Sequence, residues 1–201
     1  MTSRERVIAA IEFSGPDRVP HNNAFVPAVF RKYGRKVEEL LGRFPSDFAG
    51  ADELPDESAF RTGRFTDEWG CMWEVSLPGF GGQVVVHPLG DWKAPGRGTA
   101  TLCPYASPGS GRLRELLGGK VCFQALPDVQ FTLRHGSPED ARRHAKDMMA
   151  ALGSFDGGFI SCCELHPDLP WENMVAILET FQEYGRYPLR LAWAGDHAVE
   201  I

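Results

Sequence analysis

Hydrophobic positions in the second half of the chain alternate between short continuous runs and longer stretches with helical spacing. Apolar runs over 120–126 and 155–161 are typical of buried strands, whereas 137–152 and 170–184 have the spacing of amphipathic helices. Each of these helices starts at a serine cap or a proline and ends before a glycine. Strand, helix, strand and helix in this order predict parallel strands with right-handed crossovers, and Cys122 is predicted to lie in the core.

The first half of the chain has a less regular pattern. Thr2 and Glu5 have the spacing of a capping box at the start of a helix. Asp17 and Arg18 are predicted to form an ion pair that holds the following extended segment. The pattern then predicts, in order, helices over 27–33 and 36–41, a short strand over 44–48 and an acidic surface loop over 52–63.

An aromatic, β-branched pattern follows over 64–75 and 83–89, with a glycine-rich turn between the two segments. This arrangement predicts a β-hairpin. Residues 93–111 are rich in proline, glycine, serine and threonine without periodicity, which is typical of a linker. The predicted organisation is therefore an N-terminal part with a hairpin at 1–92, a linker at 93–111, two βα units at 112–187 and a tail at 188–201.

Composition limits the class of protein. A chain of 201 residues with 43% hydrophobic residues is long enough for one globular core. Its net charge of -6 and the lack of a basic cluster argue against nucleic acid as a partner. No apolar run approaches the length of a membrane span, and the charged N-terminus does not resemble a secretory signal. Five cysteines without paired spacing predict reduced thiols and a cytoplasmic protein.

The segment 157–173 concentrates the candidate chemistry, because a predicted strand leads there into a turn with two thiols, a carboxylate and an imidazole. The C-terminal end of a parallel strand is where α/β enzymes place reactive groups. Glu164 and His166 are candidate acid–base residues, although both also fit an ordinary polar loop before a helix. Asp128 follows the preceding strand and is a candidate for a substrate pocket.

Several short segments stand in an order that resembles the uroporphyrinogen decarboxylase superfamily. The segments are 4–7, 16–20, 67–71, 87–89, 118–123, 136–140 and 170–173. The resemblance implies a (β/α)8 barrel and either decarboxylation in haem biosynthesis or cobalamin-dependent methyl transfer. Members of this family are longer, and their central strands lie where this chain has the predicted linker. The chain is therefore predicted to be α/β, with an incomplete (β/α)8 TIM-barrel-like fold and an N-terminal β-hairpin insertion.

Two features favour the methyltransferase branch of this family. The decarboxylases carry a basic Met-Arg-Gln-Ala-Gly-Arg motif after the first strand, but residues 21–28 contain no arginine to bind substrate carboxylates. Cys163 stands where the methyltransferases have a zinc-binding cysteine, and the resemblance implies that zinc there activates an acceptor thiol. Cys162 would then point into the core, because neighbouring strand residues face opposite sides. The partner His-x-Cys motif is absent from this sequence.

The resemblance leaves three functional hypotheses. The first is an ancestral zinc-dependent methyltransferase acting on a small-molecule substrate, with a corrinoid as substrate or a corrinoid protein as partner. The second is a uroporphyrinogen III decarboxylase of porphyrin biosynthesis. The third is a non-catalytic folded remnant or interaction protein. Missing strands would expose sheet edges, and such edges predict a homodimer or an aggregation-prone monomer.

Overall fold

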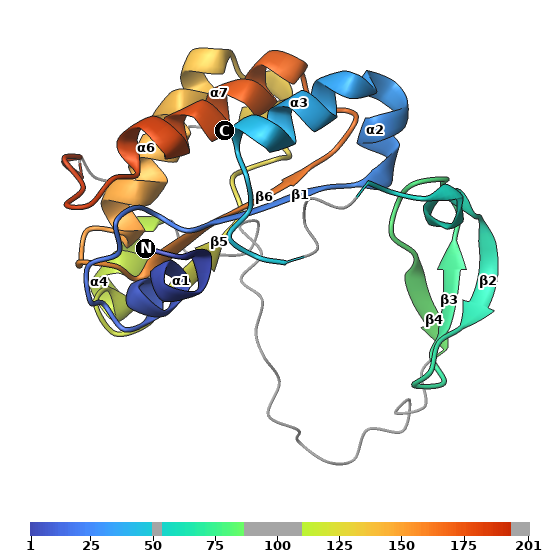
Figure 1. Cartoon of the computed structure of the whole chain (residues 1–201), viewed down its shortest axis with the longest axis horizontal. Coiled ribbons are helices and arrows are strands. Elements are labelled where there is room, and N and C mark those ends of the chain that lie inside the picture. The colour runs from blue at the N-terminus through green and yellow to red at the C-terminus, as the bar shows by residue number, and fades with distance from the viewer. Residues whose placement is uncertain (50–53, 87–109, 194–201) are drawn as a thin grey trace.

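The computed structural model describes residues 1–49, 54–86 and 110–193, and this part of the chain has a mixed α/β architecture. One sheet is parallel, with strand order β1-β6-β5, and the other is antiparallel, with order β2-β3-β4 (Figure 1). The described strands form no closed barrel. The parallel strands are β1 (His21–Phe25), β5 (Phe123–Ala125) and β6 (Phe159–Leu165).

The first strand of the chain is the direct neighbour of the last one. β1 and β6 pair in parallel from His21 opposite Ser161 to Phe25 opposite Leu165. β5 pairs in parallel with the other edge of β6. The prediction of parallel strands in the second half is confirmed, and β1 joins them although residues 26–122 separate it from β5 in sequence.

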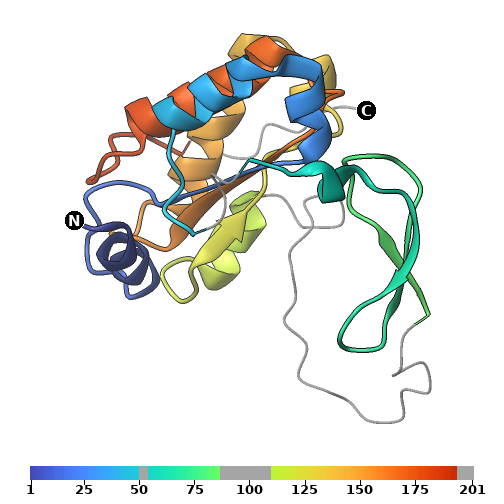
Figure 2. The ribbon, with the colours of Figure 1, turned by 45° about the vertical axis from the view of Figure 1, so that its right-hand side comes forward.

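Helices cover one face of the parallel sheet (Figures 1 and 2). On this face α6 (Pro138–Leu152) and α7 (Trp171–Tyr184) pack against each other, and both contribute to the core beneath β6. Phe159, Met149 and Phe181 are fully buried in this core. The helices of the chain are α1 (Ser3–Ile11), α2 (Pro27–Tyr33), α3 (Arg35–Arg43), α4 (Ser110–Leu117), α5 (Thr132–His135), α6 (Pro138–Leu152) and α7 (Trp171–Tyr184), with a 3-10 turn η1 at Glu57–Phe60.

Local capping signals placed the helix starts correctly. Thr2 and Glu5 form the predicted capping box of α1, and Ser137 forms a second one with Asp140 at the start of α6. The helix predicted at 36–41 is longer and includes Gly42. The strand predicted at 44–48 is wrong, because Ser46 and Asp47 instead hydrogen-bond through Oγ and the backbone N–H to the carbonyl of His21.

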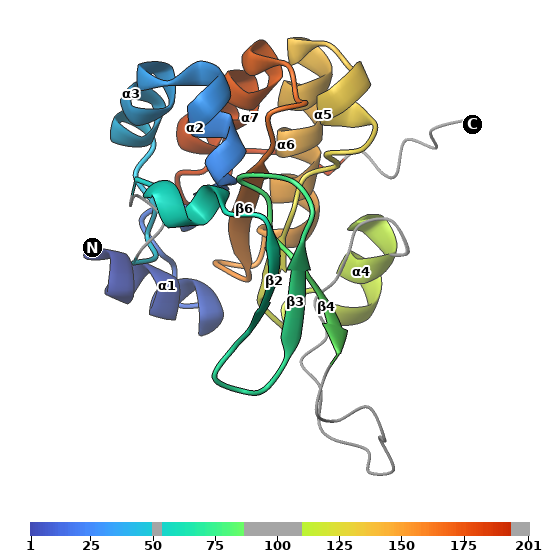
Figure 3. The same ribbon diagram turned by 90° about the vertical axis from the view of Figure 1, so that its right-hand side faces the viewer.

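The predicted hairpin is a three-stranded sheet of β2 (Gly63–Thr66), β3 (Met72–Val75) and β4 (Gln83–Val86). The segment taken as one strand turns back at Asp67, whose carboxylate accepts hydrogen bonds from the N–H groups of Trp69 and Cys71 and from the indole of Trp73. Figure 3 shows this sheet standing apart from the helical layer. It is joined to α2 by a backbone hydrogen bond of 3.0 Å from Ala28 to Gly79.

The final strand begins four residues later than predicted. Asp156, Gly157 and Gly158 have φ of 57°, 142° and 80°, which are incompatible with an extended strand. At Gly158 a Cβ would lie 2.4 Å from the ring of Phe13, so this close approach to α1's C-terminal turn requires glycine. β6 therefore starts at Phe159 and runs through the segment that was predicted to be a reactive turn.

Candidate functional site

The two neighbouring thiols of β6 lie on opposite faces of the parallel sheet. The face predicted for each is wrong, because Cys162 was expected in the core and Cys163 at the site. Cys163 is 0% exposed and packs in the apolar cluster beneath the helices. Cys162 therefore faces the other side, which we call the open face. Burial raises the pKa of Cys163 far above its usual range. The pKa of Cys162 is also raised, mainly by burial and further by the charge of Glu164, against a lowering contribution from Gln124.

Polar side chains from all three strands meet around Cys162 on the open face. The side-chain nitrogens of Asn22 on β1 and Gln124 on β5 lie 3.8 Å and 3.5 Å from its sulfur. Glu164 follows two residues later on β6, faces the same side and is exposed. Asn22 and Gln124 were not selected from the sequence. For Gln124 the signal in the sequence is a polar residue in the middle of an apolar strand, whereas Asn22 lies between His21 and Asn23 and has no such signal.

His166 and Asp128 do not join this group. The His166 ring packs against Phe80, with ring centroids 6.2 Å apart, and the described residues provide no hydrogen bond from it to Glu164. The Asp128 carboxylate accepts hydrogen bonds from the N–H groups of Phe131 and Thr132 and from the Thr132 hydroxyl. Burial raises the pKa of Asp128, but these hydrogen bonds outweigh it and the net shift is downward. Asp128 thus fixes the turn that leads into α5.

The described residues do not assemble a complete zinc site. Nowhere in the ranges that the structure describes do three histidine, cysteine, aspartate or glutamate side chains group closely enough to hold a metal ion. Cys163 is surrounded by apolar side chains. The open face presents two donors, Cys162 and Glu164, whereas a catalytic zinc site uses three protein ligands and one open position.

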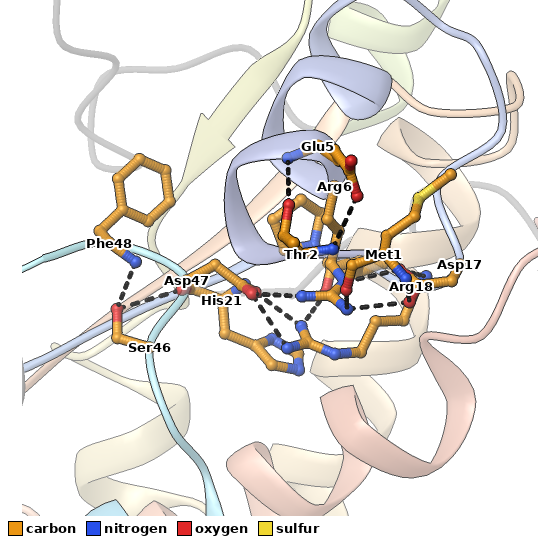
Figure 4. Close-up of polar contacts among 12 residues, drawn as sticks. Met1, Thr2, Glu5, Arg6, Asp17, Arg18, His21, Ser46, Asp47 and Phe48 are labelled. Carbon is orange, nitrogen blue, oxygen red and sulfur yellow. Dashed lines mark hydrogen bonds and ion pairs between the residues drawn. The ribbon is translucent and has the colours of Figure 1, made fainter.

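A second polar cluster, missed in the sequence, lies where β1 begins (Figure 4). Asp47, with 1% of its side chain exposed, accepts hydrogen bonds from Arg6 at 2.6 Å, from Arg18 at 2.7 Å and from the His21 backbone at 2.8 Å. Asp17 is bound by Arg6 through two nitrogens, at 2.5 Å and 2.8 Å. The predicted ion pair between Asp17 and Arg18 is therefore wrong, since each residue takes a partner from a distant segment.

These contacts set the charge states of the cluster. Burial raises the pKa of Asp47, but the bonds from Arg18 and His21 outweigh it and lower the pKa overall. The bond from Arg6 lowers the pKa of Asp17 strongly. His21 is buried, with Nδ1 2.9 Å from the Ser161 hydroxyl. Burial and the neighbouring Arg18 charge lower the pKa of His21 to about 4, so its ring is neutral near pH 7.

Comparison with known proteins gave no similarity that could name a family. No family model matches the chain, and neither the curated proteins nor the solved structures contain a match. Among the described helices, none is long and apolar enough to cross a membrane.

The placement of the thiols predicts a difference in reactivity. In the native protein at pH 8, iodoacetamide should modify Cys162, which is half-buried, at least ~100-fold faster than Cys163, which requires the core to open. Mass spectrometry of tryptic peptides, with Cys162→Ser and Cys163→Ala as single variants, assigns the two sites. Comparable native rates for the two thiols would contradict the register of β6.

Proposed function

We propose that this chain is a shortened member of the uroporphyrinogen decarboxylase superfamily, derived from its methyltransferase branch. The pairing of β1 with β6 is the observation that carries the proposal. A closed (β/α)8 barrel requires its first and last strands to be parallel neighbours. The order β1-β6-β5 is the order of the first, last and penultimate strands around such a barrel.

The faces of the sheet support the same assignment. Barrel helices lie outside the strands, so the side opposite the described helices α6 and α7 corresponds to the barrel interior. Cys162, Glu164, Asn22 and Gln124 all lie on that side. The open face is thus the part of an ancestral active-site wall that this chain retains, and its small-molecule partner would bind there.

The chemistry of the open face favours methyl transfer over decarboxylation. The three parallel strands carry no arginine or lysine, and Glu164 adds a negative charge. A substrate with many carboxylates would find no cationic partner on these strands. A soft thiol suits zinc or corrinoid chemistry instead. Cys162, rather than Cys163, is the thiol that this chain would contribute. Because the described residues supply two donors, we assign no methyl-transfer step to them.

The outer edges of the sheets favour a second function, that of an interaction protein. Both β1 and β5 pair on one side alone within the part of the chain that the structure describes. The antiparallel sheet carries exposed apolar side chains, with Phe65 at 53% and Val86 at 55% exposure on its strands and Trp69 at 76% in the turn between β2 and β3. Unpaired edges and exposed apolar strands favour association with another chain, and a homodimer remains the proposal.

Zinc analysis of the purified protein tests the assignment of the thiol. We expect less than one zinc per chain, because the open face offers fewer donors than a catalytic site needs. Whatever zinc the wild type binds should be lost in Cys162→Ser and kept in Cys163→Ala. One zinc per chain, lost in a folded Cys163→Ala variant, would restore the family position as the ligand. Circular dichroism of both variants controls for unfolding, and light scattering reports whether the chain dimerises.

A further inference from the structure

A small pocket opens beside the polar cluster, where β1 begins. It has a volume of about 190 Å³ and is lined by Arg18, His21, Phe44, Pro45, Gln182 and Arg186. Two of these side chains are guanidinium groups and none is a carboxylate. The lining is therefore electropositive, although the chain as a whole carries a net charge of -6.

The backbone forces the two arginines together. Arg18 and Arg186 are opposite residues of an isolated antiparallel bridge, framed by hydrogen bonds from Val19 to Gly185 at 2.8 Å and from Tyr187 to Asp17 at 3.3 Å. Opposite residues of an antiparallel pair place their side chains on the same side. Like charges in this relation repel each other, so the bridge has a cost unless a negative group lies between them.

The protein neutralises one of these charges. Arg18 is bound by Asp47, at 2.7 Å and 3.1 Å. Arg186 has no ion pair with a carboxylate in the part of the chain that the structure describes. The Nε2 atom of His21 has no hydrogen bond partner there either, while Nδ1 is held by Ser161. The pocket therefore combines the exposed guanidinium of Arg186, which has no carboxylate partner among the described residues, with an imidazole nitrogen that makes no hydrogen bond there.

We propose that this pocket binds a small oxyanion, such as inorganic phosphate or the phosphate group of a small metabolite. Arg186 and Arg18 donate hydrogen bonds to the anion, Gln182 donates from its amide, and Phe44 and Pro45 close the apolar side. A tetrahedral oxyanion suits the volume and the planar donor groups of the arginines. The anion then ties the segment after α7 to the start of β1.

Protonation of His21 strengthens this binding. The imidazolium donates from Nδ1 to Ser161, whose hydroxyl donates onward to the Pro20 carbonyl, and from Nε2 to the anion. Burial, Arg18 and Arg6 oppose the added charge, while Asp47 and the bound anion favour it. Anion affinity should therefore rise as the pH falls.

Calorimetric titration of the full chain with inorganic phosphate at pH 7 and constant ionic strength tests the site. Arg186→Gln should weaken phosphate binding about tenfold or more, because a charge-assisted hydrogen bond is lost. Arg190→Gln removes the same charge from an exposed position outside this pocket and should leave the affinity within about twofold. Equal weakening in the two variants, or no phosphate binding by the wild type, would overturn the proposal.

A pH series with sulfate isolates the contribution of His21, because the charge of sulfate is constant from pH 8 to pH 4, a range that reaches the His21 pKa of about 4. Sulfate should bind the wild type more tightly at the lower pH and bind His21→Gln with no such increase. An equal increase in both proteins would remove His21 from the site. Titration with glycerol 3-phosphate separates the two sources of anion, since tighter binding of the ester assigns the pocket to a metabolite and tighter binding of free phosphate assigns it to the inorganic ion.

Discussion

Replacement of Asp47 by asparagine is expected to lower the free energy of unfolding by about 3–5 kcal/mol, the usual cost of breaking a buried ion pair. The carboxylate is almost fully buried and binds two arginines and a backbone N–H. Asparagine keeps the size of the side chain but removes the carboxylate that Arg18 binds and leaves Arg6 paired with Asp17 alone. Urea denaturation followed by circular dichroism measures the loss.

A matched control comes from an ion pair on the surface. Glu179 binds Arg43 at 2.9 Å, with 38% and 58% of the two side chains exposed. Glu179→Gln removes the same carboxylate charge, and it should cost less than about 1 kcal/mol because the pair is solvated. If Asp47→Asn costs no more than this control, Asp47 does not hold the three segments together.

Stability should also fall as the pH drops from 8 to 5, by about 2 kcal/mol from His21 alone. The folded pKa of His21 is lowered to about 4, below its value in the unfolded chain. The unfolded chain therefore takes up the proton first, and the stabilising contribution is complete above the unfolded pKa and is lost as the pH falls toward 4. Denaturation curves at several pH values give this dependence.

Two variants separate His21 from other groups that titrate in this range. The pKa of His144 is also lowered, chiefly by burial, so His144→Gln should remove a different part of the dependence. His21→Gln should flatten the curve by the His21 contribution while leaving the His144 contribution in place. Asp17 and Asp47 have lowered pKa values and lose their contributions only under more acidic conditions. An unchanged slope in His21→Gln would show that His21 is solvated in the folded protein.

Local interactions explain the correct predictions of the helices. The capping boxes at Thr2 and Ser137 join residues three positions apart, so their geometry is contained in the sequence. The start of β6 was wrong because the glycines at 157 and 158 adopt positive φ where they pass Phe13 of a distant segment. That contact is invisible to a pattern of apolar residues along the chain.

The candidate site shows the same limit at single-residue resolution. Strand residues alternate between the two faces of a sheet. An error about the face of one residue therefore assigns every residue of that strand to the wrong face. The segment containing both thiols was identified, but Cys162 reaches the open face and Cys163 the core. Asn22 and Gln124 could not be associated with them, since only the pairing of β1 and β5 with β6 brings the three strands together.

The sequence by itself determined most of the helices, the presence of parallel strands and the segment that carries the thiols, because caps, periodicity and turn residues act over a few positions. It did not indicate α5 or η1. Only the tertiary structure decided which thiol faces outward and that the first strand pairs with the last. It also decided that Arg6 binds both Asp17 and Asp47, and that Arg18 binds Asp47. Those outcomes depend on pairings between segments far apart in the chain, where strand register and burial select the partners and local sequence carries no preference among them.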